Sequence, residues 1–224
     1  MTTTDRRFKV PKMEGALARW YARQRRSGGQ LERYRQQAAQ LTAGLPDGAD
    51  ILEVAPGPGY HAIELARLGR YHVTGLDISQ TFIQIARDNA REAGVDIDFR
   101  HGDAQQMPFA DESFDLIVCQ AAFKNFSRPV TALNEMHRVL RPGGLAVIQD
   151  MSHDATGTDI RREVDGMGLP WRQAFTVRWI LAVLRLRALS PQWFRRLAAE
   201  SAFSSGEVQA EGMGLEVRLR KQPG

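Results

Sequence analysis

The chain has 224 residues, 43% of them hydrophobic, which is enough for one domain of ordinary size with a complete core. Its single cysteine, Cys119, excludes an internal disulfide and a cysteine-rich metal site, and the apolar neighbours predict a buried, inert thiol. The net charge of +4 is uneven: residues 1–35 and 161–224 are basic, whereas residues 36–160 carry 9 basic and 17 acidic side chains.

Two interpretations of this charge distribution stay open. The basic ends are either arginine-rich helix faces in contact with water, or surfaces that lie on an anionic substrate or a membrane. Residues 1–7 contain no apolar segment of the kind that begins a secretory leader, so we expect a reducing, cytoplasmic location.

The first elements in chain order are two predicted helices, residues 14–26 and 30–44, separated by Ser27-Gly28-Gly29. After a turn, apolar segments alternate with amphipathic ones, which predicts a parallel sheet covered by helices on both faces. Strands are predicted at 51–55, 71–77, 96–100, 114–120 and 145–150, and helices at 60–69, 79–93 and 128–140.

The last part of the chain departs from this alternation. A helix is predicted over 191–203, followed by strands at 207–210 and 215–219 that form a hairpin. The hairpin would place an antiparallel strand at the edge of the parallel sheet. The predicted fold class is therefore α/β, a doubly wound, mostly parallel seven-stranded sheet.

About forty residues lie between strand 145–150 and helix 191–203. Their most apolar stretch, Trp179 to Leu184, is too short to span a bilayer, which takes ~20 residues. Three interpretations of this insertion stay open: a lid or wall over a substrate, a plain core helix, or a helix in contact with a membrane or lipid.

A glycine turn, residues 55–59, follows the first strand directly. A second strand ends in an acid, Asp77, eighteen residues after Gly59. Bare glycines let a ligand approach the backbone N–H groups at the start of a helix. An acid at the tip of the next strand accepts hydrogen bonds from ribose hydroxyls. The pair predicts a mononucleotide or adenosine site.

Further motifs stand in order at the ends of successive strands. They are Glu53-Val54-Ala55-Pro56-Gly57-Pro58-Gly59, Gly75-Leu76-Asp77-Ile78, Gly102-Asp103-Ala104, Phe114-Asp115-Leu116-Ile117-Val118 and Arg141-Pro142-Gly143-Gly144. The ordered set resembles the class I S-adenosylmethionine-dependent methyltransferases over residues 45–150 and the terminal hairpin. Phe123-Lys124-Asn125-Phe126 resembles the small-molecule branch that includes the quinone C-methyltransferases.

The resemblance implies a Rossmann-like methyltransferase fold, S-adenosylmethionine as cofactor, a small, apolar acceptor, and neither a metal nor a nucleic-acid partner. It also divides the chain. The implied parts are an N-terminal helical lid (1–44), a cofactor-binding core (45–152), a helical insertion or substrate lid (153–189), and the last helix with the edge hairpin (190–224).

The resemblance also assigns roles to single residues at the amino-acid end of the cofactor. Gly57 and Gly59 would approach its amino-acid part, Glu53 would order the turn by hydrogen bonds to backbone or water, and Gln120 would face the methionine end. The departure is Ala55, where the family usually has its first glycine. We expect φ at Ala55 to stay negative, because alanine tolerates the left-handed region poorly.

At the nucleoside end, the resemblance implies that Asp77 holds the ribose and Ile78 flanks the adenine. Asp103 would accept from the adenine amine, beside the backbone of Ala104. Independently of the resemblance, Tyr21 and its neighbour Trp20 on the first helix are candidates either to close over the cofactor or to pack in the core.

Methyl transfer from a sulfonium chiefly needs an aligned acceptor and excluded water, and some acceptors also need a general base. The candidate base is His153, just beyond the tip of strand 145–150, with Asp150 and Lys124 as weaker alternatives. His137 is expected to be structural. His61 can touch either the cofactor or solvent.

Three rival functions remain. Gly57-x-Gly59-x-x-Ala62 with Asp77 also satisfies the dinucleotide pattern of a nicotinamide dehydrogenase. The chain can also be a member of the fold that binds the cofactor without methylating, or a phospholipid methyltransferase that uses its basic ends on a membrane.

Overall fold

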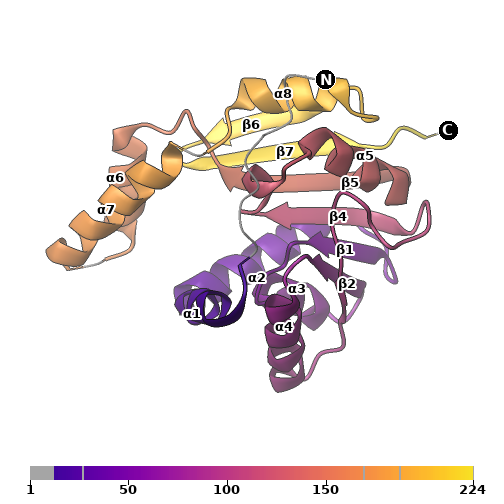
Figure 1. Ribbon diagram of the computed structural model, residues 1–224, viewed down its shortest axis with the longest axis horizontal. Coiled ribbons are helices and arrows are strands. Elements are labelled where there is room, and N and C mark those ends of the chain that lie inside the picture. The colour runs from indigo at the N-terminus through magenta and orange to yellow at the C-terminus, as the bar shows by residue number, and fades with distance from the viewer. Residues whose placement is uncertain (1–12, 27, 169, 187, 224) are drawn as a thin grey trace.

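One seven-stranded sheet, in the order β3-β2-β1-β4-β5-β7-β6, runs through the computed structural model of the protein (Figure 1). The structure describes residues 13–26, 28–168, 170–186 and 188–223, so the first twelve residues of the predicted N-terminal lid lie outside the described residues. The first five strands run parallel, and β7 runs antiparallel to both β5 and β6. The predicted fold class is confirmed.

The strands fall close to their predicted positions. Their bounds are β1 (Asp50–Val54), β2 (His72–Asp77), β3 (Asp98–His101), β4 (Phe114–Gln120), β5 (Leu140–Met151), β6 (Glu207–Glu211) and β7 (Gly214–Arg220). The last strand in the chain, β7, is inserted beside β5, so β6 forms the edge of the sheet.

Helices connect the strands and cover the sheet. Their bounds are α1 (Gly15–Gln24), α2 (Gly28–Thr42), α3 (Tyr60–Arg67), α4 (Gln80–Ala93), the short 3-10 helix η1 (Phe123–Asn125), α5 (Pro129–Val139), α6 (Gly157–Gly166), α7 (Trp171–Arg185) and α8 (Pro191–Glu200).

Helix α4 shows how local sequence sets these bounds. The Ser79 hydroxyl accepts from the Phe82 N–H and caps the start of the helix, and Gly94 ends it in the left-handed conformation.

The core has two layers because buried side chains alternate along the central strands. Ile51 and Leu116 pack on one face, with residues of α3 and α4, and Leu52 and Ile117 pack on the other, with residues of α5 and α8. Cys119 belongs to the second layer and is fully buried, and burial raises the pKa of its thiol. The burial of this thiol predicted from the sequence is thereby confirmed.

The Arg141–Gly144 segment differs from its prediction as a turn that precedes a strand. It lies inside β5, at an irregularity where Phe114 pairs with Leu140 and Leu116 pairs with Leu145. Gly143 donates to the Lys221 carbonyl, and the Lys221 N–H donates to the Gly144 carbonyl. This pairing with the residues after β7 draws the glycines into the sheet.

The insertion forms two helices, α6 and α7, that project from the carboxyl end of β5 (Figure 1). The plain-core interpretation is wrong, because α7 contributes no buried side chain. An ion pair between Arg33 of α2 and Glu163 of α6, 2.9 Å long, connects the projection to the N-terminal helices. Among the described residues, no helix has the length and apolarity needed to cross a bilayer.

Candidate active site

The turn after β1 contains three residues with positive φ: Ala55 at 57°, Gly57 at 55° and Gly59 at 78°. The prediction of a negative φ at Ala55 is therefore wrong. The Ala55 N–H donates to the Leu76 carbonyl at 2.7 Å and ties the turn to β2. That bond helps to hold a conformation that ordinarily costs an L-residue roughly 1–2 kcal/mol.

The two glycines of the turn have different surroundings. A Cβ atom at Gly59 would lie 2.9 Å from both the Ala86 Cβ and the Phe99 Cζ, which is closer than atoms in contact can approach. A Cβ atom at Gly57 would meet no atom within 4 Å. Gly59 therefore allows α4 and β3 to pack closely against the turn, whereas Gly57 leaves the other side of the turn open to a ligand.

Asp77, at the end of β2, joins this turn to the next one. Its carboxylate accepts from the Gly57 N–H at 3.0 Å and from the Ser79 N–H at 2.8 Å. The side chain is buried, and burial raises its pKa, although the two N–H donors act in the opposite direction. Each oxygen of a carboxylate can accept a further hydrogen bond, so Asp77 keeps acceptor capacity for ribose hydroxyls.

Glu14 fastens the N-terminal helices to the same corner of the sheet. Its carboxylate accepts from the N–H groups of Gln80 and Thr81, both at 3.0 Å, at the start of α4. The Thr81 hydroxyl also donates to it, which lowers the pKa of Glu14. The start of α1 is thus held against Gln80 and Thr81, the two residues that directly follow Ser79.

Glu53 and His61 form a buried pair beside the glycine turn. The Glu53 Oε2 lies 3.4 Å from the His61 Nδ1, and the Tyr34 ring meets the imidazole edge-on at 5.9 Å. Neither that carboxylate oxygen nor either imidazole nitrogen has a hydrogen-bond partner among the described residues. His61 is thus shielded from solvent and lies beside the Glu53 carboxylate.

The carboxyl end of β3 places Asp103 next to the β2 end. Asp77 and His101 are register partners, and the Gly102 N–H donates to the Asp77 carbonyl. The Asp103 carboxylate accepts from the backbone and side-chain amides of Gln105, at 2.9 and 3.0 Å. This arrangement orders the acid at the position where an adenine amine is expected.

Two further residues of the predicted adenine side lie nearby. The Ile78 carbonyl is 3.1 Å from the His101 Nε2, and Ala104 is buried at the margin of the second core layer.

Side-chain hydrogen bonds connect the ends of β4 and β5 to β7. The Gln120 amide donates to Gln149 at 2.9 Å, and the Gln149 amide donates to Glu216 of β7 at 2.7 Å. Ala121, the next residue after β4, has a φ of 53°. Strained backbone therefore follows both β1 and β4 at the same edge of the sheet.

The weaker base candidates, Lys124 and Asp150, form an ion pair at this edge. The Lys124 Nζ lies 2.8 Å from the Asp150 Oδ1 and 2.7 Å from the Ala121 carbonyl oxygen. The Asp150 side chain is almost completely buried and also accepts from the Met151 N–H. The Asp150 carboxylate is therefore enclosed by the protein and poorly placed to reach an acceptor.

His153 lies immediately beyond β5, as predicted. Its side chain is 56% exposed, and its Nδ1 lies 3.4 Å from the Asp154 carboxylate. Tyr21 is half-buried on α1, where it meets Phe82 edge-on at 5.8 Å. His137 packs against Phe203 away from the carboxyl ends of the strands, in agreement with the structural role predicted for it.

No sequence motif indicated the contributions of Glu14, Gln149 and Glu216. Gln149 and Glu216 are register partners in adjacent strands, and the polar Gln149 directly after the apolar residues 145–148 of β5 was a usable signal. Glu14 had no local signal, because its partners lie 66 and 67 residues away.

Comparison with family models matches residues 52–148 to a methyltransferase domain. A demethylmenaquinone methyltransferase from Deinococcus radiodurans is 38% identical over 108 residues, which is 48% of this chain and 45% of that protein. A second one, from Renibacterium salmoninarum, is 36% identical over 131 residues, or 58% and 53% of the two chains. The chain therefore spans about half the length of the curated relatives that it matches.

Among solved structures, a putative S-adenosylmethionine-dependent methyltransferase from Methanococcus maripaludis superposes with a TM-score of 0.73. The two are 21% identical, and the match covers 96% of each chain. This similarity shows the fold, in agreement with the resemblance drawn from the motifs. The dinucleotide interpretation of the glycine turn is set aside, because the same residues fall inside the methyltransferase match.

Proposed function

We propose that this chain, whose residues 52–148 match a methyltransferase domain, transfers the methyl group of S-adenosylmethionine to a small apolar acceptor by in-line displacement. The observation that carries the proposal is the link between the glycine turn and β2. The Gly57 N–H donates to Asp77, and Asp103 stands at the end of the adjacent strand. Backbone, ribose acceptor and adenine acceptor thus share one edge of the sheet.

The residues at this edge fit S-adenosylmethionine. Gly57 has open space where a side chain would stand, so the backbone can lie against the amino-acid part of the cofactor. Asp77 retains acceptor capacity for the ribose hydroxyls, and Ile78 would flank the adenine ring. The unpartnered oxygen of Glu53 suits an ammonium group or a bound water beside the turn.

S-adenosylmethionine supplies a methyl group that its sulfonium already activates. The work left to the protein is to hold the acceptor in line and to exclude water. For an acceptor with a hydroxyl or an acidic carbon, His153 is the better base of the candidates. Its imidazole is accessible, whereas Asp150 is buried against Lys124. Gln120, held by Gln149, would face the methionine end of the cofactor.

The finer proposal is that the acceptor is an aromatic ring of the quinone class. Its support is the identity of 38% and 36% to two proteins named demethylmenaquinone methyltransferase. The α6–α7 segment, together with α1 and α2, would form the lid over this acceptor. Its position at the carboxyl end of β5 supports that role, because ligands of open α/β sheets bind at the carboxyl ends of the strands.

The test is incubation of the purified chain with S-adenosylmethionine and demethylmenaquinone or a short-chain analogue. The expected result is release of S-adenosylhomocysteine together with one added methyl group on the ring, both detected by mass spectrometry. Phospholipid acceptors are assayed in parallel. Tight cofactor binding without methylation of either acceptor class would favour a member of the fold that catalyses another reaction. The structural neighbour SpnF, described as a cyclase, is 24% identical with a TM-score of 0.59.

We also propose that the chain acts in the cytoplasm without a nucleic-acid partner. The buried, unpaired thiol of Cys119 is compatible with a reducing compartment. Fractionation of cells that express the tagged chain would test the location.

A further inference from the structure

Helix α7 exposes an unusual amount of apolar surface. Of the ten large hydrophobic side chains that are exposed among the described residues, eight lie between Met167 and Leu186. Trp171, Phe175 and Trp179 are 75, 70 and 65% exposed. Aromatic side chains of this size are ordinarily buried in a protein core or an interface. This exposed surface therefore indicates a binding site for a partner.

The exposed aromatic residues form one stripe. At about 100° per residue, Trp171, Phe175, Trp179 and Leu186 fall within about 80° of one another around the helix axis. Hereafter these four residues are called the α7 stripe. Ile180 and Leu184, each 43% exposed, lie on the opposite side of the helix. The α7 stripe therefore points in one direction, and a second, weaker apolar side remains available for an acceptor.

Positive charge flanks the α7 stripe. Arg172 lies next to one edge, where its guanidinium stacks on the Trp171 ring at 5.1 Å, and Arg178 and Arg185 lie next to the other. Helix α7 contains no acidic residue, and residues 157–187 hold six arginines against three acidic residues. Aromatic and leucine side chains bordered by arginine are typical of helices that lie in the plane of a membrane interface.

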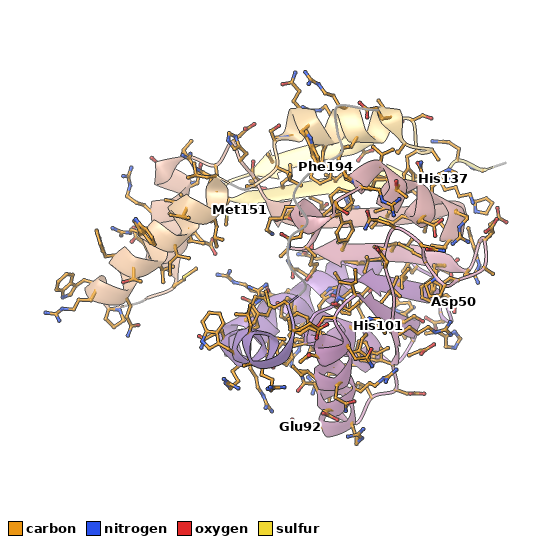
Figure 2. The ribbon with its side chains drawn as sticks, in the orientation of Figure 1. Asp50, Glu92, His101, His137, Met151 and Phe194 are labelled. Atoms are coloured by element: carbon orange, nitrogen blue, oxygen red, sulfur yellow. The ribbon has the colours of Figure 1, made fainter. Side chains whose placement is uncertain are left out.

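We propose that α7 docks this protein on the surface of an anionic bilayer, with the α7 stripe in the headgroup region. The helix lies parallel to the surface, because its 15 residues are fewer than the ~20 needed to span the hydrocarbon. Tryptophan rings favour the interface, and Arg172 pairs with acidic headgroups. Arg178 already pairs with Asp165 of α6 at 2.6 Å, and Arg185 donates to the Ala155 carbonyl at 2.6 Å. Figure 2 shows that α6 and α7, with their side chains, project beyond the rest of the molecule.

A second copy of the chain fits this surface less well. Two α7 stripes packed face to face would bring the flanking arginines of both copies together. Asp165 of α6 neutralises Arg178, but no acidic residue lies on either α7 to neutralise Arg172. An anionic bilayer offers an apolar region for the α7 stripe and negatively charged headgroups for the arginine beside it. The proposal does not depend on the methyl-transfer reaction, since docking needs neither cofactor nor acceptor.

The experiment is flotation of the full chain with mixed phosphatidylglycerol–phosphatidylcholine vesicles and with pure phosphatidylcholine vesicles. We expect wild type to float with the mixed vesicles and at least about tenfold less with the neutral ones. The triple variant Trp171→Ser, Phe175→Ser, Trp179→Ser should lose at least about tenfold in vesicle binding. The matched control, Ile180→Ser with Leu184→Ser, removes apolar groups from the opposite side of the same helix and should float like wild type.

Thermal unfolding of each variant serves as the folding check, and the melting temperatures should agree because α7 buries no side chain. Failure of wild type to float, or equal flotation of the triple variant, overturns the proposal. Self-association of wild type that the triple variant abolishes, without vesicle binding, would assign the surface to a second copy instead. The Arg172→Glu variant should weaken binding to the mixed vesicles only.

Discussion

Substituting alanine for Gly57 or for Gly59, in the turn between β1 and α3, distinguishes a glycine needed for packing from a glycine needed for ligand binding. At Gly59, an alanine Cβ would lie 2.9 Å from Ala86 Cβ and Phe99 Cζ, in a backbone with a φ of 78°. The left-handed conformation costs about 1–2 kcal/mol, and overpacking costs about 1–3 kcal/mol. The reduced entropy of the unfolded chain returns about 0.4–1 kcal/mol. The free energy of unfolding should therefore fall by about 1–4.5 kcal/mol.

At Gly57 an alanine Cβ would meet no atom within 4 Å, so only the cost of the left-handed backbone conformation applies. Because the lower entropy of the unfolded chain offsets part of this cost, the free energy of unfolding should fall by about 0–1.5 kcal/mol. Ala55 already holds a φ of 57° in the same turn, which shows that the fold tolerates such a residue. The cost of Gly57→Ala should instead appear in the affinity for S-adenosylmethionine, which we expect to fall at least about tenfold, or ~1.4 kcal/mol.

Urea unfolding without ligand and calorimetric titration with the cofactor measure the two quantities on both variants. Equal stabilities of Gly57→Ala and Gly59→Ala would refute the close packing of α4 and β3 against the turn. Wild-type cofactor affinity in Gly57→Ala would refute the contact between this turn and the cofactor.

Three further predictions concern single side chains. Asp77→Ala should weaken S-adenosylmethionine binding by ~1–3 kcal/mol, because ribose hydroxyls lose a buried acceptor, and unchanged calorimetric affinity would remove Asp77 from the site. His153→Ala should lower kcat at least about tenfold with an acceptor that must lose a proton, while cofactor affinity stays constant; a near wild-type rate would mean that no base acts there. His137→Asn should flatten the loss of stability on acidification. Burial lowers the pKa of His137, so the unfolded chain takes up the proton first and wild-type stability falls as the pH drops below about 6.5. Melting temperatures of wild type and His137→Asn, measured across that pH range, test this prediction. An equal fall of the melting temperature in both proteins would contradict it.

The sheet could be predicted because its signals are local. Apolar strands such as 114–120 and stop signals such as Gly94 depend on neighbouring residues, and the structure keeps them within a few positions. The left-handed Ala55 was not predictable in this way. Its conformation is held by a bond to Leu76, which belongs to another strand. Likewise, Arg141–Gly144 enters the sheet only because residues after β7 pair with it.

The candidate site could be predicted only in part, for the same reason. Its acids were found because each follows a strand, and strand ends meet at one edge of a parallel sheet. Sequence periodicity could not tell that α7 leaves its tryptophans exposed, since an apolar helix is usually buried. Nor could it pair Glu53 with His61 or attach Glu14 to the start of α4.

The place of β7 in the sheet has a consequence for biosynthesis. Strand β5 pairs with β7 along most of its length, yet β7 leaves the ribosome after the other six strands of the sheet. Until then, the nascent chain carries an unpaired β5 edge, and the buried side chains of Leu215, Val217 and Leu219 are missing from the second core layer. Open edges of this kind invite pairing with other chains. A stop codon before residue 214 should therefore yield an aggregating product even though every proposed cofactor-binding residue is present.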